Sequence, residues 1–273
     1  MHGFTLPLIL LTNDDGVLSP GLGAAAAALD PLGELLIAAP LEQQTGMGRS
    51  MPYANDGRIT EITITREGKS WPGYGVQASP AQTVLHALLE LAPRQPTLAV
   101  AGINYGANVS TSVTISGTIG AALEAAAYGV PALAVSLETE QSAHLVLDGS
   151  IDLTAAAFFT RFFAERMLAI QPPADLDVLK VEIPRNANPQ TPWRVTRLER
   201  KPFYVAIAPR RRSFEELGRL DYGQVDPESL SGRDTDAAAI VEGVVAVTPL
   251  SLDMTSRLDM QALQRLLGGQ SWA

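Results

Sequence analysis

The chain has 273 residues, of which 46% are hydrophobic and 18% charged, so it can bury a large core and is not a disordered polypeptide. Its net charge of −9 argues against a general nucleic-acid binder, because binding a phosphate backbone requires clustered Lys and Arg. The lack of cysteine excludes disulfides, zinc–thiolate sites and Cys nucleophiles. No apolar run reaches the length of a membrane span and residues 1–6 lack signal-peptide features, so we expect a cytoplasmic protein.

Residues 1–185 alternate predicted strands and helices. In chain order they are a buried strand at 7–12, a turn at 13–20, an Ala-rich helix at 21–29, a buried strand at 34–39, a polar loop at 41–49, an alternating strand at 59–65, a helix at 80–91, a strand at 97–102, a polar loop at 103–116, a helix at 117–128, a strand at 132–137, a helix at 151–168 and a strand at 178–183. Continuous apolar strands are typical of parallel sheets that are covered on both faces. This order predicts an α/β fold with a doubly wound, mostly parallel sheet.

The pattern changes after residue 185. A hairpin is predicted at 194–207, a strand at 238–248, and a terminal helix at 256–267 that returns to the core. We therefore predict a core domain at 1–185 and a small β-rich arm with a terminal helix at 186–273.

In an open parallel sheet, ligands bind beyond the carboxyl ends of the strands, so the loops after the strands at 7–12, 34–39 and 97–102 should share one crevice. Those loops contain carboxylates, amides, hydroxyls and glycines: Asn13 to Gly16, Gln43 to Gly46, and Asn104 with 108–118. Oxygen ligands of this kind suit a hard cation such as Mg²⁺ or Mn²⁺.

Asp14 and Asp15 follow the first strand directly. Adjacent carboxylates repel each other unless a cation or hydrogen-bond donors compensate. A simple turn, with one Asp capping the next helix and Gly16 supplying a positive φ, is the alternative interpretation. The place of the pair at the carboxyl end of a strand favours metal binding.

Two further segments have the chemistry of a phosphate site. Asn104 and Asn108, with glycines between them, offer oxygen ligands and amide donors, although asparagine turns explain them equally well. The sequence 116–118, Ser-Gly-Thr, opens a helix, and a helix N-terminus binds anions. Ordinary capping by Ser116 or Thr118 is compatible with that role.

Other motifs are discounted. Gly21-x-Gly23-x-x-Ala26 weakly resembles a dinucleotide fingerprint, but it lies beyond two aspartates that repel a pyrophosphate unless a metal intervenes. The third hypothesis, a nicotinamide-dependent dehydrogenase, rests on this weak glycine match alone. Residues 210–212, three arginines, are interpreted as a solvated charged segment.

Several motifs in order resemble the stationary-phase survival protein E (SurE) family. They are Leu10 to Gly16 with Pro20-Gly21, Ala39-Pro40 with Thr45-Gly46, Gly102 to Asn108, Ser116 to Thr118, Gly129 to Ser136, Thr235-Asp236 and Val247 to Leu250. Together they span nearly the whole chain.

The resemblance implies a three-layer α/β/α fold, 5′/3′-nucleotidase activity with one divalent cation, and a homodimer or homotetramer held partly by an exchanged C-terminal segment. It implies that Asp14, Asp15, Thr45 and Asn104 bind the metal, and that Asp14, Asp15 and Asn104 are catalytic. The implied phosphate-binding residues are Gly46, Asn108, Ser116, Gly117 and Thr118. The substrate is then a nucleoside monophosphate, with no nucleic-acid duplex and no membrane as partner.

The chain departs from the family pattern at several positions. Thr45 replaces a serine, and Leu41, Gln82, Thr111 and Ser112 stand where acidic residues are usual. A nucleotide- or phosphate-binding homologue with weakened catalysis is therefore the alternative function. In the enzyme hypothesis, either aspartate orients an attacking water, or one forms an aspartyl-phosphate; both remain open.

Overall fold

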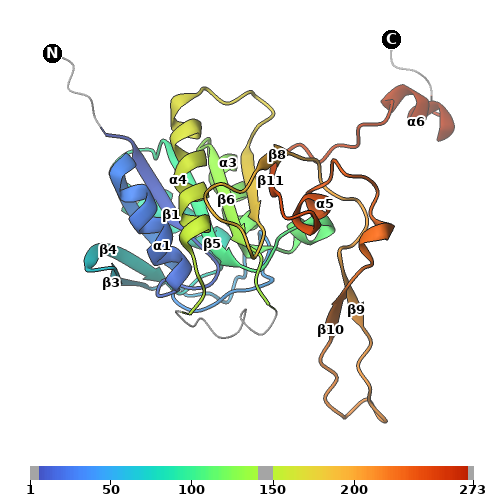
Figure 1. Ribbon diagram of the computed structural model, residues 1–273, viewed down its shortest axis with the longest axis horizontal. Helices are drawn as coiled ribbons and strands as arrows, with labels where there is room; N and C mark the ends of the chain where they lie inside the picture. The colour runs from blue at the N-terminus through green and yellow to red at the C-terminus, as the bar shows by residue number, and fades with distance from the viewer. Residues whose placement is uncertain (1–5, 141–149, 270–273) are drawn as a thin grey trace.

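A nine-stranded sheet forms the centre of the protein in the computed structural model, which describes residues 6–140 and 150–269 (Figure 1). Its strand order is β3-β4-β2-β1-β5-β6-β7-β11-β8, and the pairs from β4 to β7 are parallel. The strands are β1 (Leu8–Thr12), β2 (Glu34–Pro40), β3 (Ile59–Arg66), β4 (Lys69–Val76), β5 (Leu98–Tyr105), β6 (Ala132–Leu137), β7 (Val178–Ile183), β8 (Trp193–Val195) and β11 (Val245–Leu250).

Helices cover both faces of this sheet. Leu8 and Leu10 of β1 pack in one core with α2 and α3, whereas Ile9 and Leu11 pack in a second core with α1 and α4. These helices are α1 (Pro20–Leu29), α2 (Pro80–His86), which continues as a π-helical turn (Ala87–Leu91), α3 (Gly117–Ala127) and α4 (Thr154–Ala169). Short 3-10 turns lie at Asp30–Leu32, Ser110–Thr114 and Pro227–Ser229. The alternation of strand side chains between two apolar cores confirms the predicted three-layer α/β/α sandwich.

Serine side chains cap three of the helices, and the cap at Ser116 was predicted from the sequence. Ser19 accepts a hydrogen bond from the Leu22 N–H, and Ser116 accepts one from the Ile119 N–H. Ser79 forms a reciprocal capping box with Gln82, one of the positions that departs from the family pattern. These caps satisfy backbone donors that have no acceptor inside their own helix.

The order in which strands are added to the sheet reverses at β1. Its neighbours are β2 on one side and β5 on the other, and successive strands move outward from it in both directions. The crevice at such a switch point, beyond the carboxyl ends of the strands, is where open α/β sheets bind ligands. The loop after β1, which carries Asp14 and Asp15, lies at this point.

The predicted hairpin at 194–207 is wrong. Residues 193–195 form β8, which pairs in parallel with β11 at the edge of the main sheet. Residues 204–207 form β9 (Tyr204–Ile207), which pairs instead with β10 (Asp221–Gln224) in a ribbon that projects from the body (Figure 1). The error arose because strand pairing here joins segments that lie far apart in the sequence.

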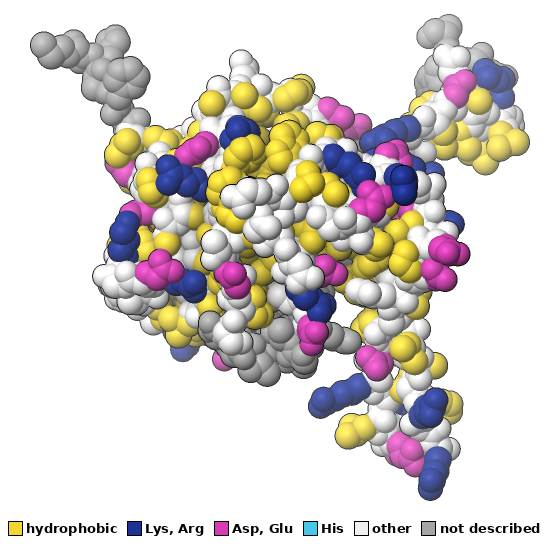
Figure 2. All heavy atoms as spheres, viewed as in Figure 1, with side chains coloured by type: hydrophobic (Ala, Val, Ile, Leu, Met, Phe, Trp, Pro, Cys, Tyr) yellow, Lys and Arg dark blue, Asp and Glu magenta, His cyan; other side chains and the backbone are white. Residues whose placement is uncertain are grey.

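Three further predictions about elements need correction. The strand expected at 238–248 is partly helix, because Thr235 caps α5 (Asp236–Val241) and only then does β11 begin. β4 was missed, since its Pro72, Gly73 and Gly75 obscure the strand pattern. The terminal helix is α6 (Met260–Leu266), which has no buried residue and stands away from the body rather than returning to the core (Figure 2).

Within residues 186–273, β8 and β11 extend the main sheet, whereas β9, β10 and α6 lie outside it. None of the helices described in residues 6–140 and 150–269 is long and apolar enough to cross a membrane.

Candidate metal and phosphate site

A network centred on Asn13 shapes the loop that carries the two aspartates. The Asn13 side chain donates to the Gly16 carbonyl at 3.0 Å and to the Ser19 hydroxyl at 2.6 Å. The Gln44 N–H donates to the Asp14 carbonyl at 2.7 Å, which ties this loop to the one after β2. Both aspartates are 3% exposed, so the fold holds two adjacent carboxylates inside the protein.

Asp14 contacts the start of α3. One of its carboxylate oxygens, Oδ1, accepts a hydrogen bond from the Thr118 hydroxyl at 2.5 Å. Gly117 is required at its position, because a Cβ there would lie 2.7 Å from both the Cβ and Oδ2 of Asp14. The N-terminus of α3 and the Asp14 carboxylate therefore meet directly, which brings together three of the predicted site residues.

Asp15 contacts segments that belong to the two neighbours of β1. Its Oδ1 accepts from the Gln43 side chain at 3.2 Å, and its Oδ2 accepts from the Tyr105 N–H at 3.2 Å. Gln43 lies in the loop after β2 and Tyr105 ends β5. The carboxylate is thus oriented from both sides, by the loop after β2 and by the end of β5, the two strands that flank β1.

The two carboxyl groups are difficult to ionise in this environment. Burial, followed by the charge of Asp15, raises the pKa of Asp14 to about 7. Burial also raises the pKa of Asp15 to about 6, although hydrogen bonds from Tyr105 and Gln43 oppose the shift. Within the described part of the chain, no Lys, Arg or His forms an ion pair with either group. Two buried carboxylates without a compensating cation fit a hard metal ion, which would stabilise their charged form.

The remaining predicted metal ligands lie on the adjoining segments. Asn104 is 7% exposed and belongs to the end of β5, not to the loop that the sequence predicted; its side-chain amide donates to the Gly106 carbonyl at 2.7 Å. Thr45 and Gly46 are exposed and follow Gln44, whose N–H bonds to Asp14. In residues 6–140 and 150–269 no three His, Cys, Asp or Glu cluster as a metal site, so the set depends on amide and hydroxyl oxygens beside the two carboxylates.

Asn108 lies farther along the sheet edge. Its side chain donates to the Ser136 hydroxyl at 3.0 Å, and its N–H donates to Glu182 at 2.8 Å. Ser116 caps α3 and is buried. The sequence prediction assigned no role to Gln43, Tyr105 or Glu182.

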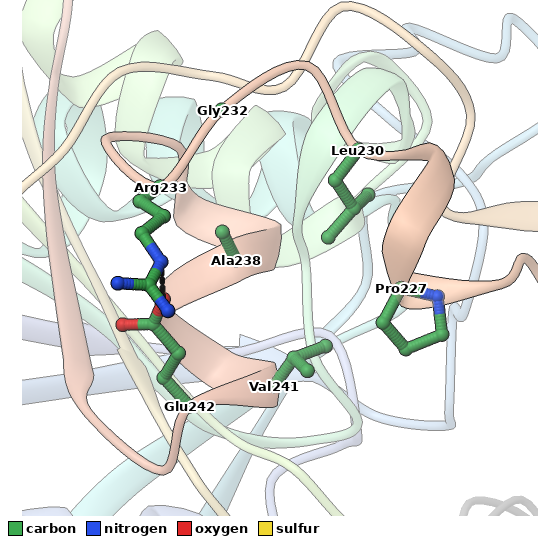
Figure 3. Close-up of a pocket in the computed structure, with 7 residues that line it drawn as sticks. All are labelled: Pro227, Leu230, Gly232, Arg233, Ala238, Val241 and Glu242. Carbon is green, nitrogen blue, oxygen red and sulfur yellow. Dashed lines mark ion pairs between the residues drawn. The ribbon is translucent and has the colours of Figure 1, made fainter.

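A separate pocket of about 200 Å³ lies beside α5 (Figure 3). Its lining includes an ion pair between Arg233 and Glu242 at 3.4 Å and the apolar side chains of Leu230 and Val241. It shares no residue with the predicted site and contains none of the carboxylate pairs described above. This pocket and the predicted site are therefore separate features of the molecule.

The close approach of α1 to β5 explains the glycine motif near residue 21. A Cβ on Gly21 would lie 2.0 Å from the Ile103 carbonyl oxygen, so glycine is needed for helix–strand packing. The motif therefore gives no support to a dinucleotide site, and with it the dehydrogenase hypothesis loses its only basis.

Fold and site together define a doubly wound α/β protein with buried carboxylates and a helix N-terminus at the switch point of its sheet. The model of the family described as survival protein SurE matches residues 9–204. The chain belongs to this family, which confirms the resemblance found in its motifs.

Relatives match over nearly the full chain. A protein of Thermococcus gammatolerans named 5′-nucleotidase SurE is 37% identical over 271 residues, covering 96% of this chain and 97% of that protein. One of the same name from Methanosarcina mazei is 38% identical over 277 residues, covering 98% and 100%. The crystal structure of the Sure protein from Aquifex aeolicus matches with a TM-score of 0.75 and 28% identity, over 96% of this chain and 100% of that one.

Proposed function

We propose that this protein is a divalent-metal-dependent phosphomonoester hydrolase, a 5′/3′-nucleotidase that releases phosphate from nucleoside monophosphates. The observation that carries the proposal is the buried pair Asp14 and Asp15, which lacks a cationic partner in the described chain and touches the N-terminus of α3. The names of the similar archaeal proteins support a nucleotidase.

In this proposal Asp14, Asp15, Thr45 and Asn104 hold one Mg²⁺ or Mn²⁺. The bound ion supplies positive charge that polarises the phosphoryl group and lowers the pKa of water. The Gln43 and Tyr105 donors keep the Asp15 carboxylate oriented, and the Thr118 hydroxyl does the same for Asp14. Positioned ligands of this kind cost little reorganisation during the reaction.

The phosphate oxygens that face the protein are bound by neutral donors. The first N–H groups of α3, from Gly117 and Thr118, have no acceptor within their helix and favour an anion. Gly46, Asn108 and Ser116 complete the proposed phosphate site. One aspartate orients the attacking water in this scheme, and an aspartyl-phosphate is the alternative step.

The test is phosphate release from 5′- and 3′-nucleoside monophosphates with Mn²⁺, with Mg²⁺ and with chelator. Turnover that requires the metal and is lost in Asp14→Asn, Asp15→Asn supports the proposal. The exposed Asp221→Asn is the matched control and should keep full activity. Nucleotide binding without turnover in the wild-type protein would refute it in favour of the phosphate-binding homologue.

We also propose that copies of the chain assemble into a homodimer or homotetramer through residues 186–273. The support is exposed apolar surface on the projecting ribbon and on α6, where Phe214 is 96% and Leu266 83% exposed (Figure 2). Light scattering tests this assembly. The wild-type protein should have the mass of a dimer or tetramer, and Phe214→Ser, Leu266→Ser should lower that mass. A monomeric wild-type protein contradicts the proposal. The cytoplasmic location stays a prediction.

A further inference from the structure

A row of polar side chains crosses the sheet from the proposed site into the interior. In the strand register, Asn104 of β5 lies beside Ser136 of β6, and Ser136 lies beside Glu182 of β7. Neighbouring residues in register share one face of a sheet, as do residues two apart on a strand, so Lys180 belongs to the same face. Lys180 and Glu182 are both 0% exposed, which is unusual for charged side chains.

These side chains converge on the backbone and the side chain of one residue, Asn108. Glu182 Oε2 accepts from the Asn108 N–H at 2.8 Å, Lys180 Nζ donates to the Asn108 carbonyl at 3.0 Å, and Ser136 Oγ accepts from the Asn108 amide at 3.0 Å. Both hydrogen-bonding groups of the Asn108 backbone are thus bound by charged partners. Bonds with an ionised partner are about twice as strong as neutral ones.

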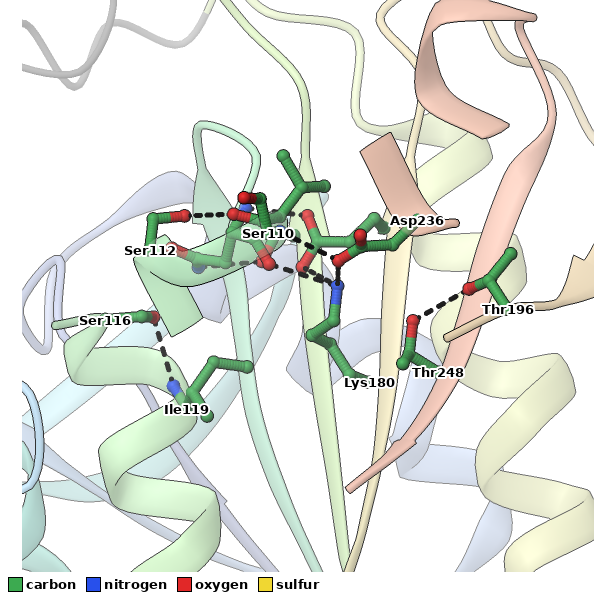
Figure 4. Close-up of polar contacts among 12 residues, drawn as sticks. Ser110, Ser112, Ser116, Ile119, Lys180, Thr196, Asp236 and Thr248 are labelled. Atoms are coloured by element: carbon green, nitrogen blue, oxygen red, sulfur yellow. Dashed lines mark hydrogen bonds and ion pairs between the residues drawn. The ribbon is translucent and has the colours of Figure 1, made fainter. Parts of the chain in front are cut away.

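Asp236 anchors this arrangement from the C-terminal part of the chain. Its Oδ2 accepts from Lys180 Nζ at 3.0 Å and from the Ser110 N–H at 3.0 Å (Figure 4). Its Oδ1 accepts from the Glu199 N–H at 2.9 Å. Ser110 has a φ of +62°, a conformation that serine rarely adopts and that these contacts hold in place. The loop that follows Asn108 is therefore held by buried hydrogen bonds, as Asn108 itself is.

Glu182 and Lys180 are too deeply buried to bind substrate themselves. Lys180 Nζ lies 3.6 Å from Glu182 Oε1 and 3.0 Å from Asp236 Oδ2, so two buried carboxylates share one buried ammonium. A buried ion pair is often no more stable than an apolar replacement, so its benefit lies elsewhere. The bonds to Asn108 indicate that the benefit of the buried ion pair is to hold Asn108 in one position.

We propose that Lys180, Glu182 and Asp236 are positioning residues that fix Asn108 for contact with the substrate phosphate. The inference rests on the proposed function, in which Asn108 binds phosphate, and adds residues that act through it. Loss of the Glu182 acceptor lets the Asn108 peptide rotate away, which weakens binding of any phosphate ligand. A misplacement of about 1 Å in such a group costs a large factor in rate.

The test compares Glu182→Leu, which removes the acceptor, with Glu182→Gln, whose side-chain carbonyl still accepts from the Asn108 N–H. We expect Glu182→Leu to raise KM and the inhibition constant of inorganic phosphate about tenfold, a difference of about 1.4 kcal/mol. Glu182→Gln should stay within about threefold of wild type, because it rescues the bond. Thr248→Val is the matched control, since Thr248 lies beside Lys180 in register and bonds to Thr196 at 2.8 Å without touching Asn108.

A double-mutant cycle separates positioning from a general loss of stability. If Glu182 acts through Asn108, then Glu182→Leu changes kcat/KM by less than about twofold in an Asn108→Ala background, because the two effects are not additive. Additive effects, or equal losses in Glu182→Leu and Thr248→Val, overturn the inference. An inactive wild-type protein instead refutes the proposed function, so the two failures are distinguishable.

Discussion

Two groups of buried acids, one directly after β1 and one between β7 and α5, differ in the source of their positive charge. At β7, Glu182 and Asp236 share the ammonium of Lys180, which the chain itself provides. At β1, Asp14 and Asp15 receive only neutral donors within the described chain, and the pKa of Asp14 rises to about 7 as a result of burial and of the charge of Asp15. One ammonium serves two carboxylates at β7, where burial and the charge of Asp236 still raise the pKa of Glu182. Asp14 and Asp15 have no such ammonium in the described chain, so this pair depends more strongly on a bound cation or a proton.

The largest effect is expected where the internal cation is removed. Lys180→Met leaves two buried carboxylates beside each other and should lower the free energy of unfolding by about 3 to 5 kcal/mol. Urea unfolding at pH 7.5 with chelator measures this. In the matched control, Lys69→Met breaks the exposed ion pair with Asp30 at 2.9 Å and should cost less than about 1 kcal/mol. Equal losses in the two variants would remove the distinction between the two acid groups.

Removing charge at the other group should have the opposite sign. Asp14→Asn relieves the repulsion with Asp15, so without metal at pH 8 it should raise the free energy of unfolding by about 2 kcal/mol. The measurement is again urea unfolding with chelator. Added Mn²⁺ should stabilise the wild-type protein more than this variant. A destabilised Asp14→Asn would show that the neutral donors already compensate the pair.

The pH dependence of stability follows from the same raised pKa. Asp14 has a pKa of about 7 in the folded protein against an ordinary value of 3.8, so between pH 3.8 and pH 7 the folded state binds a proton that the unfolded state lacks. Lowering the pH from 8 to 6 without metal should therefore raise the free energy of unfolding, by about 1 to 2 kcal/mol. The rise should be smaller in Asp14→Asn. A free energy of unfolding that decreases as the pH is lowered over this range in the wild type contradicts the assignment.

The smallest effect concerns the approach of α3 to the carboxylate pair. Gly117→Ala places a Cβ where the Asp14 side chain lies, so the helix N-terminus has to shift and phosphate release should fall about tenfold. The catalytic rate and KM with Mn²⁺ measure this. Gly223→Ala, whose Cβ makes only an ordinary contact with Ile207 at 3.5 Å, is the control. An unchanged rate in Gly117→Ala means that the phosphate does not depend on this contact.

The parts of the fold that were predictable are those with a strong local pattern. β1 and β6 are short apolar runs bounded by turn residues, and the serine caps at Ser79 and Ser116 mark the starts of α2 and α3. The arrangement of β8 beside β11 was not predictable, because its parallel pairing depends on contacts between segments about 50 residues apart.

The residues of the candidate site also divide into those that the sequence predicted and those that it did not. Asp14 and Asp15 were found because two acids directly after an apolar strand are conspicuous, and the fold of the sheet fixes where strand ends meet. Lys180 and Glu182 were missed, since alternating charges in a strand usually indicate a solvated face. Only the tertiary contact with Asp236, 56 residues later in the chain, shows that this face is buried.

The late position of Asp236 has a consequence for the order of synthesis. While the chain emerges from a ribosome, β1, β5, β6 and β7 are made before α5 and β11, so Lys180 first meets Glu182 without its second acid, Asp236, and β7 still lacks its pairing strand β11. A nascent chain that stops before residue 236 therefore lacks the anchor of the loop around Ser110. The Asn108 segment gains its final geometry only in the last stretch of translation.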